Sequence, residues 1–84
     1  MPEQEIGHVT HYFGHIQVAA IQITQGTLRV GDTIHIKGHT SDFTQTVDSM
    51  QIDNKGVTEA KAGDVIGIKV KDKTRAGDNV YLVS

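Results

Sequence analysis

Three histidines near the start of the 84-residue chain are the first candidates for chemistry, because imidazole is a common metal ligand. On an extended strand His8 and His11, which are an odd number of positions apart, should point to opposite faces. His15 lies beyond a break in the strand pattern at Gly14. The chain has no Cys, and no clustered carboxylates complete a ligand set. The pattern therefore predicts surface histidines and no metal site.

The residue types of a nucleophile system also occur together, as His39, Ser41 and Asp42 in the segment HTSD. Groups this close in one loop cannot form the ordered line of nucleophile, base and orienting acid that catalysis needs. The phosphate loop of GTPases, GxxxxGK[ST], is absent from the sequence. The sequence predicts no catalytic residue, no cofactor and no enzyme activity.

Binding chemistry has one candidate, a basic stretch in the last third of the chain. Its cations are spaced by two residues: Lys69, Lys71, Lys73 and Arg75. On one extended strand this spacing would put all four on the same face, where they could contact RNA phosphates. The segment KDKTR (71–75), however, is expected to turn partway along and to link two strands. The alternative is a solvated surface diluted by acidic neighbours. The net charge of −2 argues against strong non-specific nucleic-acid binding, and DNA is not an expected partner.

Tyr12 and Phe13 are a second, weaker candidate for binding. Since they are adjacent on a predicted strand, one should face the core and the other could offer a surface on which a base stacks.

Three similar octets mark the turns and strands that must position these residues. They are RVGDTIHI (29–36), KAGDVIGI (61–68) and RAGDNVYL (75–82). Glycine can adopt a positive φ and aspartate can accept backbone N–H bonds, so each octet predicts a turn that begins a strand. The unequal intervals between the octets exclude a repeat architecture. The predicted structural turn residues, with one further glycine, are Gly26, Gly31, Asp32, Gly63, Asp64, Gly77 and Asp78.

Strand patterns also dominate the rest of the chain, notably over 5–13, 15–23 and 43–53, whereas 54–63 reads as a loop or one helical turn. Within 15–23 and 43–53 the apolar residues change face, which requires a bulge or a bend. Bent short strands allow a small sheet to curl and close. We therefore predict an all-β fold with one domain over 1–84, a small closed antiparallel β-barrel of six strands.

The start of the chain is polar and acidic, and no segment is apolar over the length that a membrane span needs. These features predict a cytoplasmic protein without a membrane partner.

Two stretches, QGTLRVGDTIHIKG (25–38) and VTEAKAGDVIGIKV (57–70), resemble the second domain of the translation GTPases, the β-barrel of elongation factor Tu and its relatives. The family's two Gly-Asp turns are matched by Gly26, Leu28, Gly31 and Asp32, and by Ala60, Ala62, Gly63 and Asp64. The resemblance covers roughly residues 6–83 and implies the barrel fold. VTHYF and KGHTSDFTQTVDSMQ are more similar to free-standing elongation factor-like proteins and to the C-terminal barrel of collagenase-like peptidases.

Departures from elongation factor Tu bear on the ligand. Ile21 and Gln22 stand where that factor has a Gly-Arg pair, and Gln51 stands where it places a Glu near the 3′ end of bound aminoacyl-tRNA. The resemblance therefore implies the fold more directly than the ligand.

The expected function is that of a non-enzymatic binding module that contacts RNA, the ribosome or a protein of the translation machinery such as a GTPase. The residues expected to make this contact are Lys69, Lys71, Lys73, Arg75 and Gln51. The alternative is an accessory barrel that positions substrate for a separately encoded collagenase-like peptidase or RNA-modifying enzyme. The sequence leaves both functions open.

Overall fold

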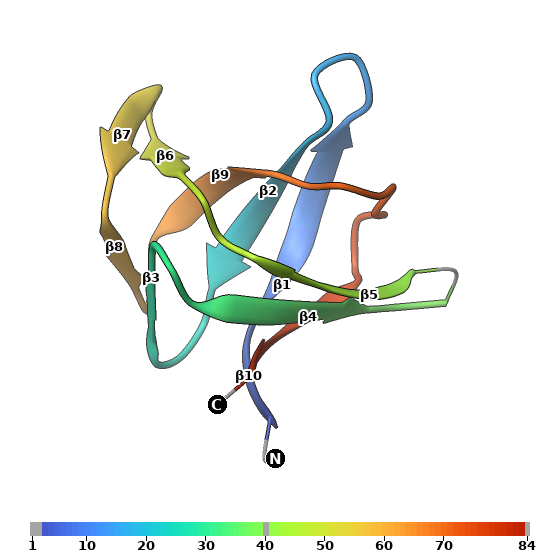
Figure 1. Ribbon diagram of the computed structural model, residues 1–84, viewed down its shortest axis with the longest axis horizontal. Helices are drawn as coiled ribbons and strands as arrows, with labels where there is room; N and C mark the ends of the chain where they lie inside the picture. The colour runs from blue at the N-terminus through green and yellow to red at the C-terminus, as the bar shows by residue number, and fades with distance from the viewer. Residues whose placement is uncertain (1–2, 40, 84) are drawn as a thin grey trace.

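The computed structural model describes residues 3–39 and 41–83, which form antiparallel strands and turns without a helix. The larger sheet has eight strands in the order β5-β4-β10-β1-β2-β9-β6-β7, and β3 pairs with β8 in a second, small sheet (Figure 1). The strands are β1 (Glu3–Phe13), β2 (Val18–Ile23), β3 (Thr27–Arg29), β4 (Thr33–Lys37), β5 (Asp42–Thr46), β6 (Met50–Ile52), β7 (Lys55–Val57), β8 (Glu59–Lys61), β9 (Val65–Lys69) and β10 (Asn79–Val83).

The sheet curls around one apolar core, which each strand supplies by alternation. In β2, Ala19, Ile21 and Ile23 are fully buried while the residues between them face outward. The same alternation places Ile34 and Ile36 of β4 in the core. The remaining buried apolar residues are Ile6, Val9, Leu28, Val47, Met50, Ala60, Ile66, Ile68, Val70 and Val80.

The long strand β1 bends through two bulges. Ile6 is an extra residue against β10, and Thr10 is an extra residue against β2. Because a bulge bends its strand and increases its twist, β1 can pair with both neighbours as the sheet curls. The Thr10 bulge also corrects a prediction. His8 and His11 lie opposite Gln22 and Ala20, two residues apart on β2, so the two histidines share a face and do not point to opposite faces.

The two predicted changes of face have different outcomes. Residues 43–53 do break, because β5 ends at Thr46 and β6 begins at Met50. The prediction for 15–23 was wrong: the chain turns over 14–17, and β2 then pairs with β9 without a shift in register. The prediction for 54–63 was also wrong, since β7 and β8 lie there and the segment has no helical turn.

The predicted six-stranded closed barrel was wrong in strand number and in closure. All-β architecture is confirmed, but the main sheet remains open, with β5 and β7 as its edges. At the edge strand β5 the Gln45 side chain makes hydrogen bonds of the kind that the backbone of a neighbouring strand would make. The Gln45 amide nitrogen donates to the Lys69 carbonyl, and the amide oxygen accepts from the Lys71 N–H, both at 2.9 Å. This bridge holds the chain after β9 against β5 without main-chain pairing.

One turn geometry occurs at all three octets. Gly31, Gly63 and Gly77 have φ of 99°, 97° and 97°, values that favour glycine, as the third residue of a type II turn requires. The following aspartate N–H donates to the carbonyl three residues back, at 2.9–3.0 Å. Its carboxylate accepts the N–H of that same residue, as Asp32 does from Arg29 at 2.9 Å. Gly26 also has a positive φ, of 73°.

No helix in the two described ranges is long and apolar enough to cross a membrane.

Candidate functional site

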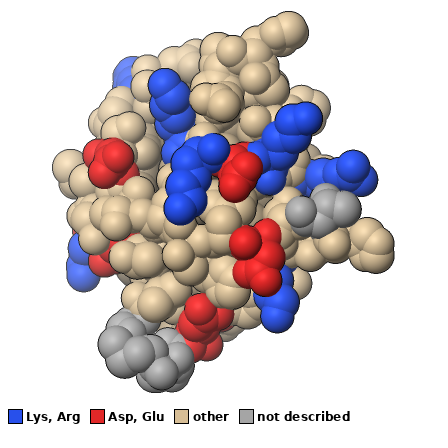
Figure 2. Space-filling model, turned by 45° about the vertical axis from the view of Figure 1, so that its right-hand side comes forward, with Lys and Arg blue, Asp and Glu red and all other residues tan. Residues whose placement is uncertain are grey.

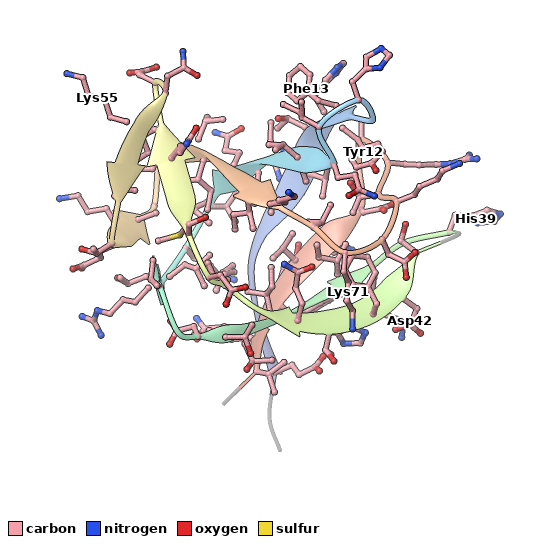
Figure 3. The ribbon with its side chains drawn as sticks, turned by 45° about the horizontal axis from the view of Figure 1, so that its top comes forward. Tyr12, Phe13, His39, Asp42, Lys55 and Lys71 are labelled. Carbon is pink, nitrogen blue, oxygen red and sulfur yellow. The ribbon has the colours of Figure 1, made fainter. Side chains whose placement is uncertain are left out.

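An open hollow of about 540 Å³ lies on the outer face of β2, β9 and β6, and we call it the apolar groove. Its lining comes from the β1–β2 hairpin, from these three strands and from the β6–β7 turn. The lining residues are Phe13, Ile16, Val18, Ala20, Gln51, Asp53, Asn54, Val65, Ile66 and Gly67. Figure 3 shows Phe13 at the tip of the hairpin, with β9 crossing between the hairpin and the β6–β7 turn that precedes Lys55.

Small residues form the floor of the groove. Ala20 and Gly67 lie opposite each other on the paired strands β2 and β9. A methyl group on Gly67 would meet the Val18 side chain at 3.4 Å. Because glycine has no side chain, the sheet surface at this position lies below the side chains around it. Larger side chains at the edges, among them Phe13 and Ile16, then act as walls.

The groove gathers most of the exposed apolar surface. In the described part of the chain four large apolar side chains are exposed, and three of them line the groove: Phe13 at 46%, Ile16 at 59% and Val65 at 50%. Scattered exposed apolar residues need no explanation, but a cluster on one concave surface marks a binding site.

Polar groups stand at one side of the groove. Gln51 lies opposite Gly67, and Asp53 and Asn54 form the turn after β6 with φ of 52° and 65°. The lining has one carboxylate and no lysine or arginine. The groove can therefore bind apolar groups and hydrogen-bonding amides, and its only formal charge is negative.

Sequence reasoning missed this groove although its signal was visible. Ile16, Val18 and Ala20 alternate with the core residues Ala19, Ile21 and Ile23, and this was read as a strand changing face. The structure shows a regular β2 with apolar residues on both sides. A strand that is apolar on its outer face, in a sheet with nothing covering it there, indicates a binding surface.

A second hollow, of about 520 Å³, opens where β9 ends, and we call it the polar hollow. Two of the predicted basic residues, Lys69 and Lys71, line it. The other lining residues are Gln17, Gln45, Thr46, Asp48, Ser49 and Val70. The predicted site residues are thus divided, since Gln51 lines the apolar groove and these two lysines line the polar hollow.

The basic stretch does not continue as a strand, since β9 ends at Lys69. All four of its cations are exposed, while Val70 and Thr74 between them are buried and anchor the loop. Figure 2 shows lysine and arginine side chains gathered on one face of the molecule with acidic side chains among them. Contact with a ligand through these cations stays a prediction.

The two adjacent aromatic residues lie on opposite sides of the sheet. Tyr12 packs against the core, whereas Phe13 is exposed and its ring centroid lies 4.4 Å from that of His11. No group of three or more histidine, cysteine, aspartate or glutamate side chains in the described residues could hold a metal ion.

The residues of the HTSD segment are directed to different partners. Ser41 is buried and its hydroxyl donates to the Lys73 carbonyl at 3.2 Å, and Asp42 contacts His35. His39 is exposed, and Thr40 lies outside the described residues. Ser41 therefore fastens the β4–β5 turn to the loop before β10.

His35 on β4 forms a bridge between two carboxylates and is half-buried. Its Nε2 lies 2.5 Å from Asp42 Oδ1, and its Nδ1 lies 2.9 Å from Glu3 Oε2. These hydrogen bonds, to Asp42 and then to Glu3, raise the pKa of His35 above 6.5, although burial opposes the shift. The bond to His35 likewise lowers the pKa of Asp42 below 3.8.

We expect this bridge to make stability depend on pH. Because the folded pKa of His35 is raised, its contribution is fully present below pH 6.5 and is lost as pH rises through the raised value. The lowered pKa of Asp42 preserves the contribution on the acid side until pH falls through that lower value. The unfolding free energies of the wild type and of His35→Gln, measured in urea, should therefore differ most near pH 5.5 and become equal at alkaline pH.

The double variant Glu3→Gln/Asp42→Asn retains the histidine and removes its two partners. Its loss of unfolding free energy relative to the wild type should depend on pH in the same way as that of His35→Gln. A difference that stays constant from pH 5.5 to pH 9 would contradict the bridge.

Comparison with known proteins assigns the chain to one domain family. Residues 17–80 match the family model of elongation factor Tu domain 2, which is most of the chain. The chain belongs to the elongation factor Tu domain 2 family. The resemblance predicted from the Gly-Asp turns is thus confirmed.

Two curated proteins similar to this chain are several times longer than it. The chain is 41% identical over 80 residues to an uncharacterized protease of Methanocaldococcus jannaschii, covering 94% of this chain and 19% of that protein. It is 35% identical over 77 residues to a collagenase of Porphyromonas gingivalis, covering 90% and 21%. The chain therefore spans about a fifth of the length of these curated relatives.

Two solved structures share the fold. Both are of the C-terminal domain of a Geobacillus thermoleovorans protein assigned to the U32 peptidases. The selenomethionine variant has a TM-score of 0.86 at 20% identity, over 92% of this chain and 96% of that domain. The other has a TM-score of 0.88 at 19% identity, over 96% and 93%.

Proposed function

We propose that the chain is a non-catalytic domain that binds a polypeptide segment for a collagenase-like peptidase of the U32 type. The observation that carries this proposal is the apolar groove, where three exposed apolar side chains surround a floor of small residues. The similarity to a protease and a collagenase supports a peptidase as the working partner.

The chemistry of the groove favours a polypeptide. Apolar side chains can fill its floor, and the amide groups of Gln51 and Asn54 can donate to and accept from the backbone of an extended segment. Nucleic-acid binding depends on neutralising phosphates with lysine and arginine, and the groove lining has neither. Asp53 would repel a phosphate placed there.

RNA binding is the second candidate function, and the exposed cations after β9 favour it. Lys69, Lys71, Lys73 and Arg75 are all exposed, as is Asp72 between them in the sequence. Figure 2 shows lysine and arginine side chains on one face of the molecule with acidic side chains among them. Such a contact would be local and sensitive to salt, given the net charge of −2.

Binding of gelatin and of a single-stranded RNA oligonucleotide, each at low and moderate salt, distinguishes the two functions. The groove variant is Phe13→Ser/Ile16→Ser, whose side chains are largely exposed and so contribute little to folding. Val30→Ser is the matched control, because Val30 is the one exposed large apolar residue of the described chain outside the groove. The basic variant is Lys71→Ala/Lys73→Ala/Arg75→Ala.

We expect gelatin to bind the wild type and Val30→Ser, and to bind the groove variant at least tenfold more weakly, since two anchoring side chains of about 1 kcal/mol each are removed. The peptide-binding proposal fails if gelatin does not bind, or if the groove variant binds it as well as the control. RNA binding that is lost only in the basic variant would instead support the second function.

A further inference from the structure

The apolar groove and the polar hollow are neighbours along β9. Three segments contribute residues to both. Residues 16 and 18 line the groove and 17 the hollow, 51 lines the groove and 49 the hollow, and 67 lines the groove and 69 the hollow. Gly67 and Lys69 lie on the same face of β9, since alternate residues of a strand do so. An extended ligand lying along this face would touch both.

The backbone that carries the two lysines is held firmly. Lys69 lies opposite Val18 in the β2–β9 pair, and the Gln45 amide bonds to the Lys69 carbonyl and the Lys71 N–H. The N–H of Val70, between them, donates to the Gln17 carbonyl at 2.9 Å. The lysine side chains therefore extend from a fixed segment (Lys71 is labelled in Figure 3).

Positive and negative side chains lie at opposite ends of this face. Lys69 and Lys71 form no ion pair within the described residues, and the hollow has one carboxylate, Asp48, against two ammonium groups. The far side of the groove carries Asp53. An acidic ligand group is thus attracted to the end of the face at Lys69 and repelled from the end at Asp53.

We propose that the outer face of β9 binds an extended polypeptide with an apolar side chain in the groove and, two residues away, an acidic side chain at Lys69 and Lys71. Alternate residues of an extended chain are about 6.6 Å apart and point to the same side, which matches the step from Gly67 to Lys69. This inference rests on the proposed function and specifies the sequence that the domain selects.

Synthetic peptides test the inference. One pair has Leu and Glu separated by a single Gly, in either order, within flanking glycines, and a second pair has Lys in place of Glu. All ends are acetylated or amidated, so that only the side chain carries charge. Binding to the full chain is measured by NMR titration at low and moderate salt, which also reports which backbone amides are affected.

The expected result is that one Leu–Glu order binds about fivefold more tightly than its Leu–Lys counterpart at low salt, because two exposed ion pairs contribute modestly. This preference should disappear in Lys69→Gln/Lys71→Gln and persist in Lys61→Gln, an exposed lysine on β8 outside both hollows.

The inference is overturned if the Leu–Lys peptides bind equally well or better, if the preference survives in the double variant, or if no peptide binds. Loss of gelatin binding in the groove variant together with equal binding of all peptides would overturn the acidic preference and leave the proposed function standing. Absence of both gelatin and peptide binding would overturn both. Saturation of Lys69 and Lys71 by the RNA oligonucleotide alone would overturn the inference in favour of phosphate binding.

Discussion

Replacing Gly7 by alanine is expected to destabilise the protein by about 3 kcal/mol or more. Gly7 lies in the middle of β1, opposite Ile23 on one side and Val80 on the other. An alanine methyl group there would collide with the carbonyl oxygen of Gln22, a backbone atom of β2 that pairing holds in place. No rotation of a side chain can relieve this overlap, so the strands would have to separate.

Urea unfolding of Gly7→Ala and of Gly56→Ala, in parallel with the wild type, measures this effect. Gly56 lies on the edge strand β7 and a methyl group on it would meet no atom within 4 Å, so its replacement should change the unfolding free energy by no more than about 0.5 kcal/mol. Equal stabilities for the two variants would show that β1 and β2 do not approach as closely as described. If Gly7→Ala does not fold at all, the absence of dispersed amide signals in NMR records the same outcome.

The second large effect is expected at Asp78. Three aspartates accept the backbone N–H three residues earlier: Asp32, Asp64 and Asp78, at 2.9–3.0 Å. Of these, Asp78 is 5% exposed, whereas the other two are only half-buried. Alanine at 78 leaves a partly buried N–H of Arg75 without its charged acceptor, which should cost about 2–3 kcal/mol. At 32 or 64 water can replace the carboxylate, and the cost should be about 1 kcal/mol or less.

The three single alanine variants, compared by thermal and urea unfolding, test this ranking. Since the turns are the same in geometry, they act as controls for one another, and what differs is the burial of the aspartate and of the N–H that it accepts. Equal losses at the three positions would mean that the hydrogen bond itself, and not its burial, decides the stability.

Local features of the fold could be predicted because single residues determine them. Each octet contains a glycine at positive φ, an aspartate whose carboxylate accepts a backbone N–H, and the alternating residues of a strand. All three signals lie within eight consecutive residues. Closure could not be predicted in this way. The edge strand β5 is joined to Lys69 and Lys71 by the Gln45 side chain, more than twenty residues away in the sequence, and a glutamine in a strand carries no sign of such a contact.

The candidate site likewise has features that the sequence predicts and features that it does not. The basic stretch was visible because charge is visible in a sequence, and the turn expected within KDKTR agrees with the end of β9 at Lys69. The apolar groove was missed because apolar residues on both faces of 15–23 admit two interpretations, a bent strand or a second binding face. The relation of His8 to His11 was wrong because nothing in the sequence marks Thr10 as a bulge.

The pairing of β1 with β10 has a further consequence for how the domain can be attached. Glu3 lies opposite Val83, so the two ends of the described chain leave the sheet side by side. Phe13, at the other end of β1, is ten residues further on, about 30 Å away along an extended strand. A linker joined at either end would therefore act as a tether on the side of the sheet remote from the hairpin. Under the proposed peptide-binding function, such a tether would leave the hairpin tip and Phe13 accessible to a ligand.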